Sequence, residues 1–456
     1  MRGLFCVPVL PDGHFFLHQL GRGGYTRRPM SERSSTIAFW FRYGPAVQAR
    51  QFLGMPMLWK RLAAKGVRIH YTSMRPARED REEADRLLAD AAAVAHYLPF
   101  RASMSGFWKG VQLLVWVALV PFFALAARFR GVDAVFIDET LPLTAFWARV
   151  FLPRRTKLAV SVVDMFLDEY GRGIWRPVAR MVQALDLWAW RRADILFIRT
   201  AAAADWLAAR GVRRERLRKV YDPCDFEVYT AALPADEREA VRAKYGFGKD
   251  DFVLVHHGIL HTYKGNDFLL RGLAELRARP DGAGWKFLLV GSGPEEARLR
   301  RMVGKLGLEG AVTFAPYMPL AELNRAIHAG DVAVAMRRPG GLSASFGVTS
   351  TLMHNMACAM PILAASIPGM LEVVADRENA LLFDPADVAS FVEAAVVLRG
   401  VTVLRLRLAE TALADAWRLF DLSMVVGIQL QALLELVKRE GKDVDEGEGG
   451  TENGDG

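Results

Sequence analysis

Apolar residues along the chain fall into short runs that alternate with helical stretches. Residues 36–41 (TIAFWF) are apolar along the whole run, as expected of a strand buried on both faces of a sheet. Segments 67–73, 132–137, 158–163 and 195–198 are predicted as further strands, with helical segments between them. This alternation predicts a parallel sheet covered by helices on both faces.

A second series of the same kind begins after a charged stretch at 234–251. The chain is therefore predicted to be an α/β protein with two doubly wound, Rossmann-like halves that join near residue 235. Ligands of such folds bind at the carboxyl ends of the strands, so we expect a site in an interdomain cleft. The predicted strands of the second half are 252–256, 286–290, 312–314, 332–335 and 361–364.

These patterns divide the chain into five predicted parts. The start of the chain lacks a clear cleavage site and a domain-like pattern, so we expect it to lie outside the fold. The end combines glycine with acidic residues and has no apolar periodicity, which predicts disorder. The parts are an extension (1–34), a first domain (35–235), a second domain (236–400), helices packing back on the first domain (401–439) and an acidic tail (440–456).

One segment departs from the alternation. Residues 111–127 (VQLLVWVALVPFFALAA) carry no charge, but the run is shorter than the roughly 20 apolar residues of a spanning helix. Pro121 is expected to kink it. Three interpretations stay open: a buried or partly buried helix of the first domain, a true span, or a helix in the membrane interface with Trp108 and Trp116 near the headgroups.

Charge and cysteine content narrow the classes of partner. The net charge is +8, and because the acidic tail has a net charge of −6, the rest of the chain carries about +14. A basic body favours anionic lipid, nucleotide phosphates or nucleic acid. No nucleic-acid-binding motif is found, so no nucleic-acid partner is expected. Three cysteines without paired spacing argue against a disulfide framework and a structural zinc site, and they favour a reducing compartment.

Residues 256–265 (HHGILHTYKG) and 291–336, with further segments from about Ala193 to Glu435, resemble the retaining glycosyltransferases of family 4, which have the GT-B fold. The first of these segments resembles the element that grips the donor diphosphate, and the second is the closest stretch in order and spacing. The order of the segments carries the resemblance, since no single motif decides it. The other similar segments are 193–225 and 356–383 and, more weakly, 135–142 and 159–170.

The resemblance implies a nucleotide-sugar site in the second domain. Lys264, at the start of a helix, would stabilise the charge that grows on the leaving diphosphate, although a solvated lysine is the alternative. The turn at Thr349, Ser350 and Thr351 would cradle phosphate at a helix start, or act only as an ordinary cap. Asp164 is a second catalytic candidate in addition to Lys264. The alternative role of Asp164 is to cap the loop in which it lies. Further predicted donor contacts are Gly258, His261, Arg337, Gly347, His354 and Glu372.

The donor region departs from the family's pattern. Ile259 stands where the family has a phosphate-binding arginine, and Phe346 and His354 stand where it has two glutamates. No glutamate lies between Asp331 and Glu372, so both carboxylates are missing. A neutral histidine can accept one hydrogen bond in their place.

Other residues compensate for these losses or add to them. Arg337 and Arg338 follow a predicted strand and could restore the charge missing at Ile259, while Val163 replaces the family's histidine before Asp164. Histidines 256, 257 and 261 cluster around one loop, but no carboxylate accompanies them. We therefore expect no metal site and no cofactor, with the nucleotide sugar as substrate.

Together these observations predict a retaining hexosyltransferase that moves a sugar from a nucleotide-sugar donor to a lipid-linked or glycan acceptor, as in polysaccharide biosynthesis. We expect a cytoplasmic location, with peripheral contact to the inner membrane through 107–130 as an open alternative. The missing arginine, glutamates and histidine leave open a non-catalytic GT-B accessory or regulatory subunit. A nucleotide-sugar epimerase of the GT-B fold is a third alternative.

Overall fold

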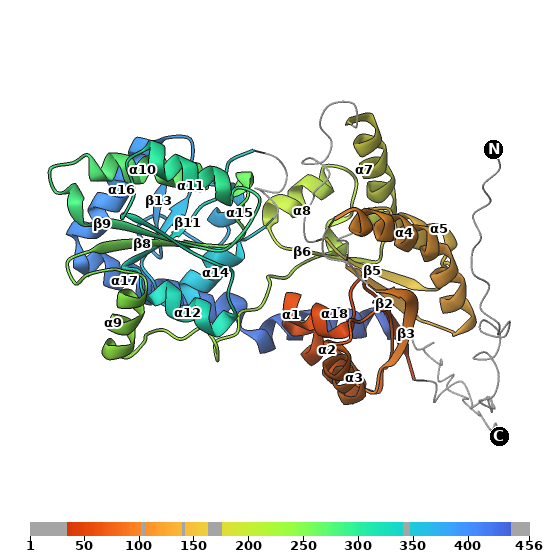
Figure 1. Cartoon of the computed structure of the whole chain (residues 1–456). Coiled ribbons are helices and arrows are strands. Elements are labelled where there is room, and N and C mark those ends of the chain that lie inside the picture. Colours follow the sequence, from red (N-terminus) through yellow and green to blue (C-terminus); the bar gives the residue numbers. More distant parts are fainter. Residues whose placement is uncertain (1–33, 102–105, 139–141, 163–175, 341–346, 439–456) are drawn as a thin grey trace, which may run out of the picture. The chain divides into compact units, whose positions relative to one another are not determined.

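The computed structural model describes residues 34–101, 106–138, 142–162, 176–340 and 347–438. These residues form two parallel sheets flanked by helices (Figure 1). The strand order is β3-β2-β1-β4-β5-β6-β7 in the first sheet and β10-β9-β8-β11-β12-β13 in the second. The predicted α/β fold with two doubly wound halves is confirmed, while the exact domain boundaries stay a prediction. The tail predicted at 440–456 lies outside the described residues, as does the extension predicted at 1–34 except for its last residue.

The strands of the first sheet send alternate side chains into two cores. Ala38 and Trp40 of β1 belong to the core under α4, α5 and α7, whereas Ile37 and Phe39 belong to the core under α2 and α18. The strands are β1 (Thr36–Trp40), β2 (Arg68–Arg75), β3 (Val94–Arg101), β4 (Ala134–Asp138), β5 (Lys157–Ser161), β6 (Ile195–Ile198) and β7 (Leu217–Lys219). The helices are α1 (Pro45–Gln51), α2 (Gly54–Ala64), α3 (Arg81–Asp90), α4 (Gly106–Phe129), α5 (Thr144–Phe151), α7 (Arg176–Trp190) and α8 (Ala201–Ala208), with η3 (Arg214–Arg216).

The second sheet lies in a single large core. Its strands are β8 (Phe252–His257), β9 (Trp285–Val290), β10 (Val312–Ala315), β11 (Val332–Ala335), β12 (Ile362–Ala365) and β13 (Leu381–Phe383). The helices of this half are α9 (Ala235–Lys244), η4 (Thr262–Lys264), α10 (Asn266–Arg277), η5 (Gly282–Gly284), α11 (Glu296–Lys305), α12 (Leu320–His328), α14 (Ser350–Ala357), α15 (Pro368–Leu371), α16 (Val388–Gly400), α17 (Thr402–Phe420) and α18 (Leu422–Val437). The last two helices differ in their packing, because α17 contributes to the second core and α18 to a core of the first sheet.

The apolar segment at 111–127 is part of α4, a single helix that continues through Pro121. Trp116, Val120 and Ala124 are buried in a core of the first sheet, so the segment is a partly buried helix. The expectation that Trp116 lies near membrane headgroups is wrong, because its side chain is only 1% exposed. In the part of the chain that the structure describes, no helix combines the length and the apolar content needed to cross a bilayer.

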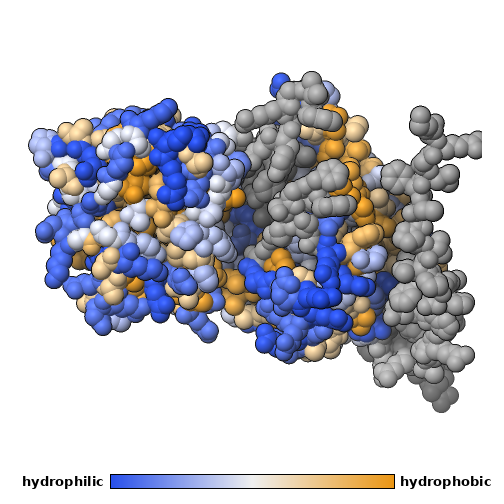
Figure 2. All heavy atoms as spheres, viewed as in Figure 1, coloured by the Kyte–Doolittle hydropathy of each residue, from blue (hydrophilic) through white to orange (hydrophobic). Residues whose placement is uncertain are grey.

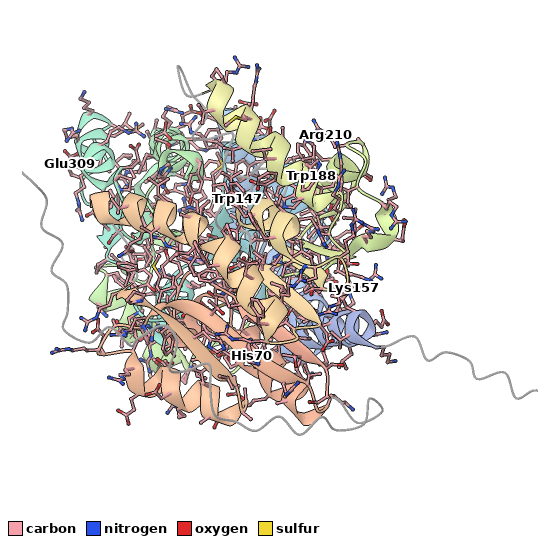
Figure 3. The ribbon with its side chains drawn as sticks, turned by 90° about the vertical axis from the view of Figure 1, so that its right-hand side faces the viewer. His70, Trp147, Lys157, Trp188, Arg210 and Glu309 are labelled. Carbon is pink, nitrogen blue, oxygen red and sulfur yellow. The ribbon has the colours of Figure 1, made fainter. Side chains whose placement is uncertain are left out.

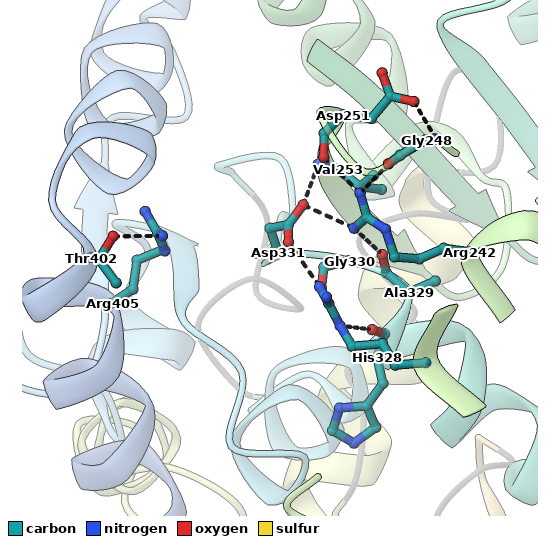
Figure 4. Close-up of polar contacts among 11 residues, drawn as sticks. Arg242, Gly248, Asp251, Val253, His328, Ala329, Gly330, Asp331, Thr402 and Arg405 are labelled. Carbon is teal, nitrogen blue, oxygen red and sulfur yellow. Dashed lines mark hydrogen bonds and ion pairs between the residues drawn. The ribbon is translucent and has the colours of Figure 1, made fainter. Parts of the chain in front are cut away.

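An ionic network closes the amino end of the second sheet (Figure 4). Asp331, just before β11, accepts hydrogen bonds from Arg238 (2.8 Å), Arg242 (3.1 Å) and the backbone N–H of Val253 (2.8 Å). Arg242 also donates to the carbonyl oxygens of Ala329, Gly248 and Asp251. The network joins α9 to the starts of β8 and β11 and explains the charged stretch that precedes the second series of strands.

Candidate functional site

Two glycine loops meet at the carboxyl end of the second sheet. The N–H of Gly258, just after β8, donates to the carbonyl oxygen of Val290 at the end of β9 (2.9 Å). A Cβ at Gly291 would lie 2.0 Å from the carbonyl oxygen of Gly258, and one at Gly293 would lie 2.4 Å from that of Leu260. The loops can approach this closely only because glycine stands at both positions.

Lys264 lies over this meeting point. Its ammonium is 3.5 Å from Thr351 Oγ1, and a Cβ at Gly258 would be 3.5 Å from the same nitrogen. Thr351 Oγ1 in turn donates to the carbonyl oxygen of His257 (2.9 Å). Lys264 is only 8% exposed, and burial strengthens the attraction between an ammonium and an anion. The structure therefore brings together Lys264, Gly258 and Thr351, three of the residues predicted to contact the donor.

Helix α14 begins beside Lys264. The Thr349 side chain caps it by accepting a hydrogen bond from the N–H of Leu352 (3.3 Å), while Ser350 is exposed and Gly347 is buried. This hydrogen bond is that of an ordinary N-cap. The positive end of the helix dipole lies at this terminus. The lysine and the helix terminus thus add positive potential at one place.

A stack of three rings lies below the lysine. The His354 ring is 4.3 Å from the Tyr229 ring and 5.6 Å from the His257 ring, and the planes are nearly parallel. Burial, helped by the charge of Lys264, lowers the pKa of His354 to about 3, and burial also holds the pKa of His257 well below its usual range. Both rings are therefore neutral at pH 7, and His257 Nε2 donates to Asn355 Oδ1 (3.1 Å).

Several buried polar atoms lack a hydrogen-bond partner among the described residues. Those in or next to the stack are Nδ1 of His354, the hydroxyl of Tyr229 and Nδ2 of Asn355, and Nε of Arg337, after β11, is another. Arg337 lies over the Tyr263 ring, with its guanidinium carbon 5.2 Å from the ring centre. Buried polar groups nearly always have partners, so unsatisfied donors and acceptors of this kind are characteristic of a place where a polar ligand binds.

Other residues predicted for the site have different neighbours. Glu372 accepts hydrogen bonds from the N–H groups of Ala201 (2.7 Å) and Ala202 (3.3 Å) and pairs with Lys219 (3.3 Å), so its carboxylate caps the start of α8. His261 is partly exposed and its ring lies 4.6 Å from the ring of Tyr263.

Arg338 was also a predicted source of positive charge for the site, and it has a partner of its own. Arg338 Nη2 donates to both carboxylate oxygens of Asp267 (2.7 and 2.5 Å), which makes Arg337 the better candidate to replace the arginine missing at Ile259. Asp164 and Phe346 lie outside the described residues.

Sequence reasoning missed a small pocket in the first sheet. It lies at the carboxyl ends of β1, β4, β5 and β6, and both apolar and polar side chains line it. Arg199 is buried there, pairs with Asp222 (2.8 Å) and has no partner for its Nε among the described residues. A charged residue directly after a predicted buried strand was the available signal, as at Asp138 and Arg199. The other polar lining residues are Gln48, Ser161 and Gln429.

One segment of the second half matches a known family. Residues 251–399 match the family "Glycosyl transferases group 1". The chain is 30% identical over 256 residues to the D-inositol 3-phosphate glycosyltransferase of Acidothermus cellulolyticus, covering 51% of this chain and 55% of that one. It is 36% identical over 157 residues to a GDP-mannose-dependent phosphatidylinositol monomannoside mannosyltransferase of Mycolicibacterium smegmatis, covering 34% and 40% of the two chains. The chain spans about half the length of the curated relatives it matches.

Solved structures share the fold over most of the chain. Anabaena HepE in complex with UDP has a TM-score of 0.66 at 19% identity, with 88% of this chain and 100% of that chain covered. Sucrose-phosphate synthase from Thermosynechococcus elongatus has a TM-score of 0.68 at 17% identity, with 88% and 99% covered.

Proposed function

We propose that this chain, whose residues 251–399 match the group 1 glycosyltransferases, transfers a sugar from a nucleotide-sugar donor to an acceptor hydroxyl. The observation that carries the proposal is the buried ammonium of Lys264, held against the glycine loops and the start of α14. A structural relative of the same fold binds UDP, which supports a nucleotide donor for this chain.

The chemistry follows from where negative charge develops. As the glycosidic bond breaks, charge grows on the leaving phosphate, and a preorganised ammonium stabilises that state more than the ground state. Lys264 and the positive end of α14 would supply this stabilisation, with Arg337 as a second cation. We propose transfer with retention, in which the leaving phosphate takes the acceptor's proton, so that no nucleophilic side chain and no resident cofactor are needed.

His354 would take over part of the work of the missing glutamates. Its neutral ring can accept or donate one hydrogen bond, and its Nδ1 lacks a partner among the described residues. A carboxylate would accept two hydroxyl groups and would add negative charge near the phosphates. Compared with a carboxylate, the neutral histidine makes one hydrogen bond fewer and adds no negative charge to the pocket.

The first half would bind the acceptor. At the carboxyl ends of the strands of the first sheet, Asp138, Arg199 and Gln429 offer a carboxylate, a guanidinium and an amide, groups that can form hydrogen bonds with hydroxyl groups of an acceptor. Two relatives act, by name, on inositol phosphate and on a phosphatidylinositol mannoside, which supports an acceptor of this type. We propose a lipid-linked or glycan acceptor at the cytoplasmic side of a membrane.

Nucleotide titration tests the donor proposal. The chain would be titrated calorimetrically with UDP-, GDP- and ADP-sugars, and Lys264→Ala should weaken the preferred nucleotide roughly 10- to 100-fold, the loss expected for a charge-assisted hydrogen bond. Lys249→Ala is the matched control, because the Lys249 side chain is 87% exposed and lies at the other end of the sheet. Failure of every nucleotide to bind would contradict the proposal.

One observation favours the alternative, a non-catalytic accessory subunit: no glutamate lies between Asp331 and Glu372. Incubation with the bound nucleotide sugar and membrane extract separates the two functions. Transfer of sugar to an extract component is expected for the enzyme. Tight nucleotide binding without transfer or donor hydrolysis would favour the accessory subunit.

A further inference from the structure

Three helices form one layer over a face of the first sheet. Helix α4 packs against α5, and α5 packs against α7. Each contributes side chains to the same core: Trp116 and Val120 from α4, Ala148 from α5, and Ala189 and Trp190 from α7. The inward side of this layer is therefore fully used in packing.

The outward side of α4 is apolar as well. Leu114, Phe122 and Phe129 are 72%, 64% and 83% exposed, and Leu125 is also exposed. At 100° per residue these four positions lie within about 80° of one another, on the side of the helix opposite Trp116 and Val120. A helix that is apolar on both sides is typical of one that has a second apolar neighbour.

The two neighbouring helices extend this surface. Val150 and Phe151 of α5 and Val178 and Met181 of α7 are exposed. Figure 2 shows apolar residues gathered over α7 and α4, and in Figure 3, which faces this side, Trp147 and Trp188 lie on the neighbouring helices. The rings of Phe146 and Trp188 lie 5.6 Å apart, so an aromatic cluster joins α5 to α7.

The charge of this surface has one sign. Helices α4 and α5 contain no acidic residue, and the one acid of α7, Asp186, is buried and accepts a hydrogen bond from the N–H of Leu143 (2.8 Å). The guanidinium of Arg192 lies 4.2 Å from the centre of the Trp188 ring. Exposed basic residues lie on these helices or within a few residues of their ends: Arg128, Arg130, Arg154, Arg155, Arg176 and Arg180.

We propose that the outer face of α4, α5 and α7 docks on an anionic lipid bilayer. An apolar helix face that enters the headgroup region, exposed aromatic rings and a basic surround are what interfacial binding requires, and basic side chains select anionic lipids. A second copy of the chain fits less well, because two such faces would bring like charges together. The proposal rests on the proposed function, in that it would place the acceptor-binding half at a membrane that carries the acceptor.

Vesicle sedimentation of the full chain tests the docking face. Vesicles of phosphatidylcholine alone and of phosphatidylcholine with about one-third phosphatidylglycerol would be compared, since anionic lipid is what recruits basic segments. The triple variant Leu114→Ser, Phe122→Ser and Phe129→Ser should bind anionic vesicles at least tenfold more weakly. The matched control is Val403→Ser with Leu406→Ser, because these side chains are 77% and 67% exposed on α17 and their loss should change nothing.

A charge variant checks the lipid selectivity. Arg176→Glu with Arg180→Glu should reduce binding to anionic vesicles several-fold and remove its dependence on salt. Equal binding of the natural chain to neutral and anionic vesicles, or unchanged binding of the triple variant, would overturn the proposal. A dimer that the triple variant dissolves, with no vesicle binding, would overturn it in favour of a second copy.

Nucleotide binding separates this proposal from the proposed function. The triple variant should bind nucleotide as the natural chain does, and equal thermal unfolding of the two would show that it folds. Vesicle binding without any nucleotide binding would leave the docking face standing and remove the transferase function. Nucleotide binding without vesicle binding would leave the proposed transferase function standing and would overturn the docking face.

Discussion

The two ends of the second sheet differ in whether their charged and polar groups have hydrogen-bond partners. At the amino end, both oxygens of Asp331 accept hydrogen bonds, and Arg242 donates to one of them and to three backbone carbonyls. At the carboxyl end, buried atoms of Tyr229, His354 and Asn355 have no partner among the described residues.

The difference separates stability from binding within one sheet. A satisfied buried network rigidifies the structure around it, whereas an unsatisfied polar group costs free energy unless a ligand completes it. Substitutions at the amino end should therefore change stability, and substitutions at the carboxyl end should change binding.

The largest effect is expected from breaking the closed end. Arg242→Met removes one partner of a buried ion pair and leaves Asp331 and three carbonyls short of donors, which should lower the free energy of unfolding by about 3–5 kcal/mol. Denaturant unfolding measures this loss. Arg325→Met is the control, because its pair with Glu237 is exposed and should contribute less than about 1 kcal/mol. A loss of similar size in both variants would contradict the contrast.

The second effect concerns the backbone of the carboxyl end. Gly291→Ala would place a Cβ 2.0 Å from the carbonyl oxygen of Gly258, so the two loops must separate at a cost of roughly 2–3 kcal/mol, and nucleotide binding should weaken with it. Gly310→Ala is the matched control, because its φ of +72° is also positive but no atom lies within 4 Å of its Cβ. Calorimetric unfolding and nucleotide titration of both variants measure the two effects.

These glycines also show how far the sequence carried the prediction. The loops around Gly258 and Gly291 and the position of Lys264 were predictable, because their order in the chain resembles that of a known family. Strand β3 was missed, since it contains Pro99 and exposes several side chains, as an edge strand can. Strand β7 was missed because it has only three residues, all of them partly or fully exposed.

Contacts between distant segments explain most of what sequence reasoning could not predict about the site. Tyr229 meets His354 only because the segment after β7 passes beside α14, and no local pattern marks that meeting. Glu372 fits a motif position, yet its carboxylate caps α8. A motif gives the residue type and its place in the chain, while its partner depends on tertiary packing.

The third effect comes from a single hydroxyl. Tyr229→Phe removes a buried hydroxyl without a partner among the described residues, so the free energy of unfolding should stay the same or rise by about 1 kcal/mol. Nucleotide affinity should fall several-fold if the hydroxyl completes its hydrogen bond with the ligand. Tyr71→Phe is the matched control, because the Tyr71 hydroxyl donates to the carbonyl oxygen of Tyr43 (2.8 Å) and its loss should lower stability by about 1 kcal/mol. Equal destabilisation by both changes would contradict the assignment.

The smallest effect is a pH dependence that originates at the open end. Burial lowers the pKa of His354 to about 3, so below its ordinary pKa of about 6.5 the unfolded chain takes up a proton that the folded chain does not. The stability linked to this ring is complete above pH 6.5 and is lost as the pH falls towards 3. Between pH 7 and pH 6 the loss is about 0.7 kcal/mol. His354→Gln should remove this share of the pH dependence, whatever it does to stability at pH 8. Unfolding curves of the two chains at pH 8, 7 and 6 would test it, and parallel pH profiles would mean that the pKa of the ring is the same in the folded and unfolded chains, which would contradict a lowered pKa of His354 in the folded chain.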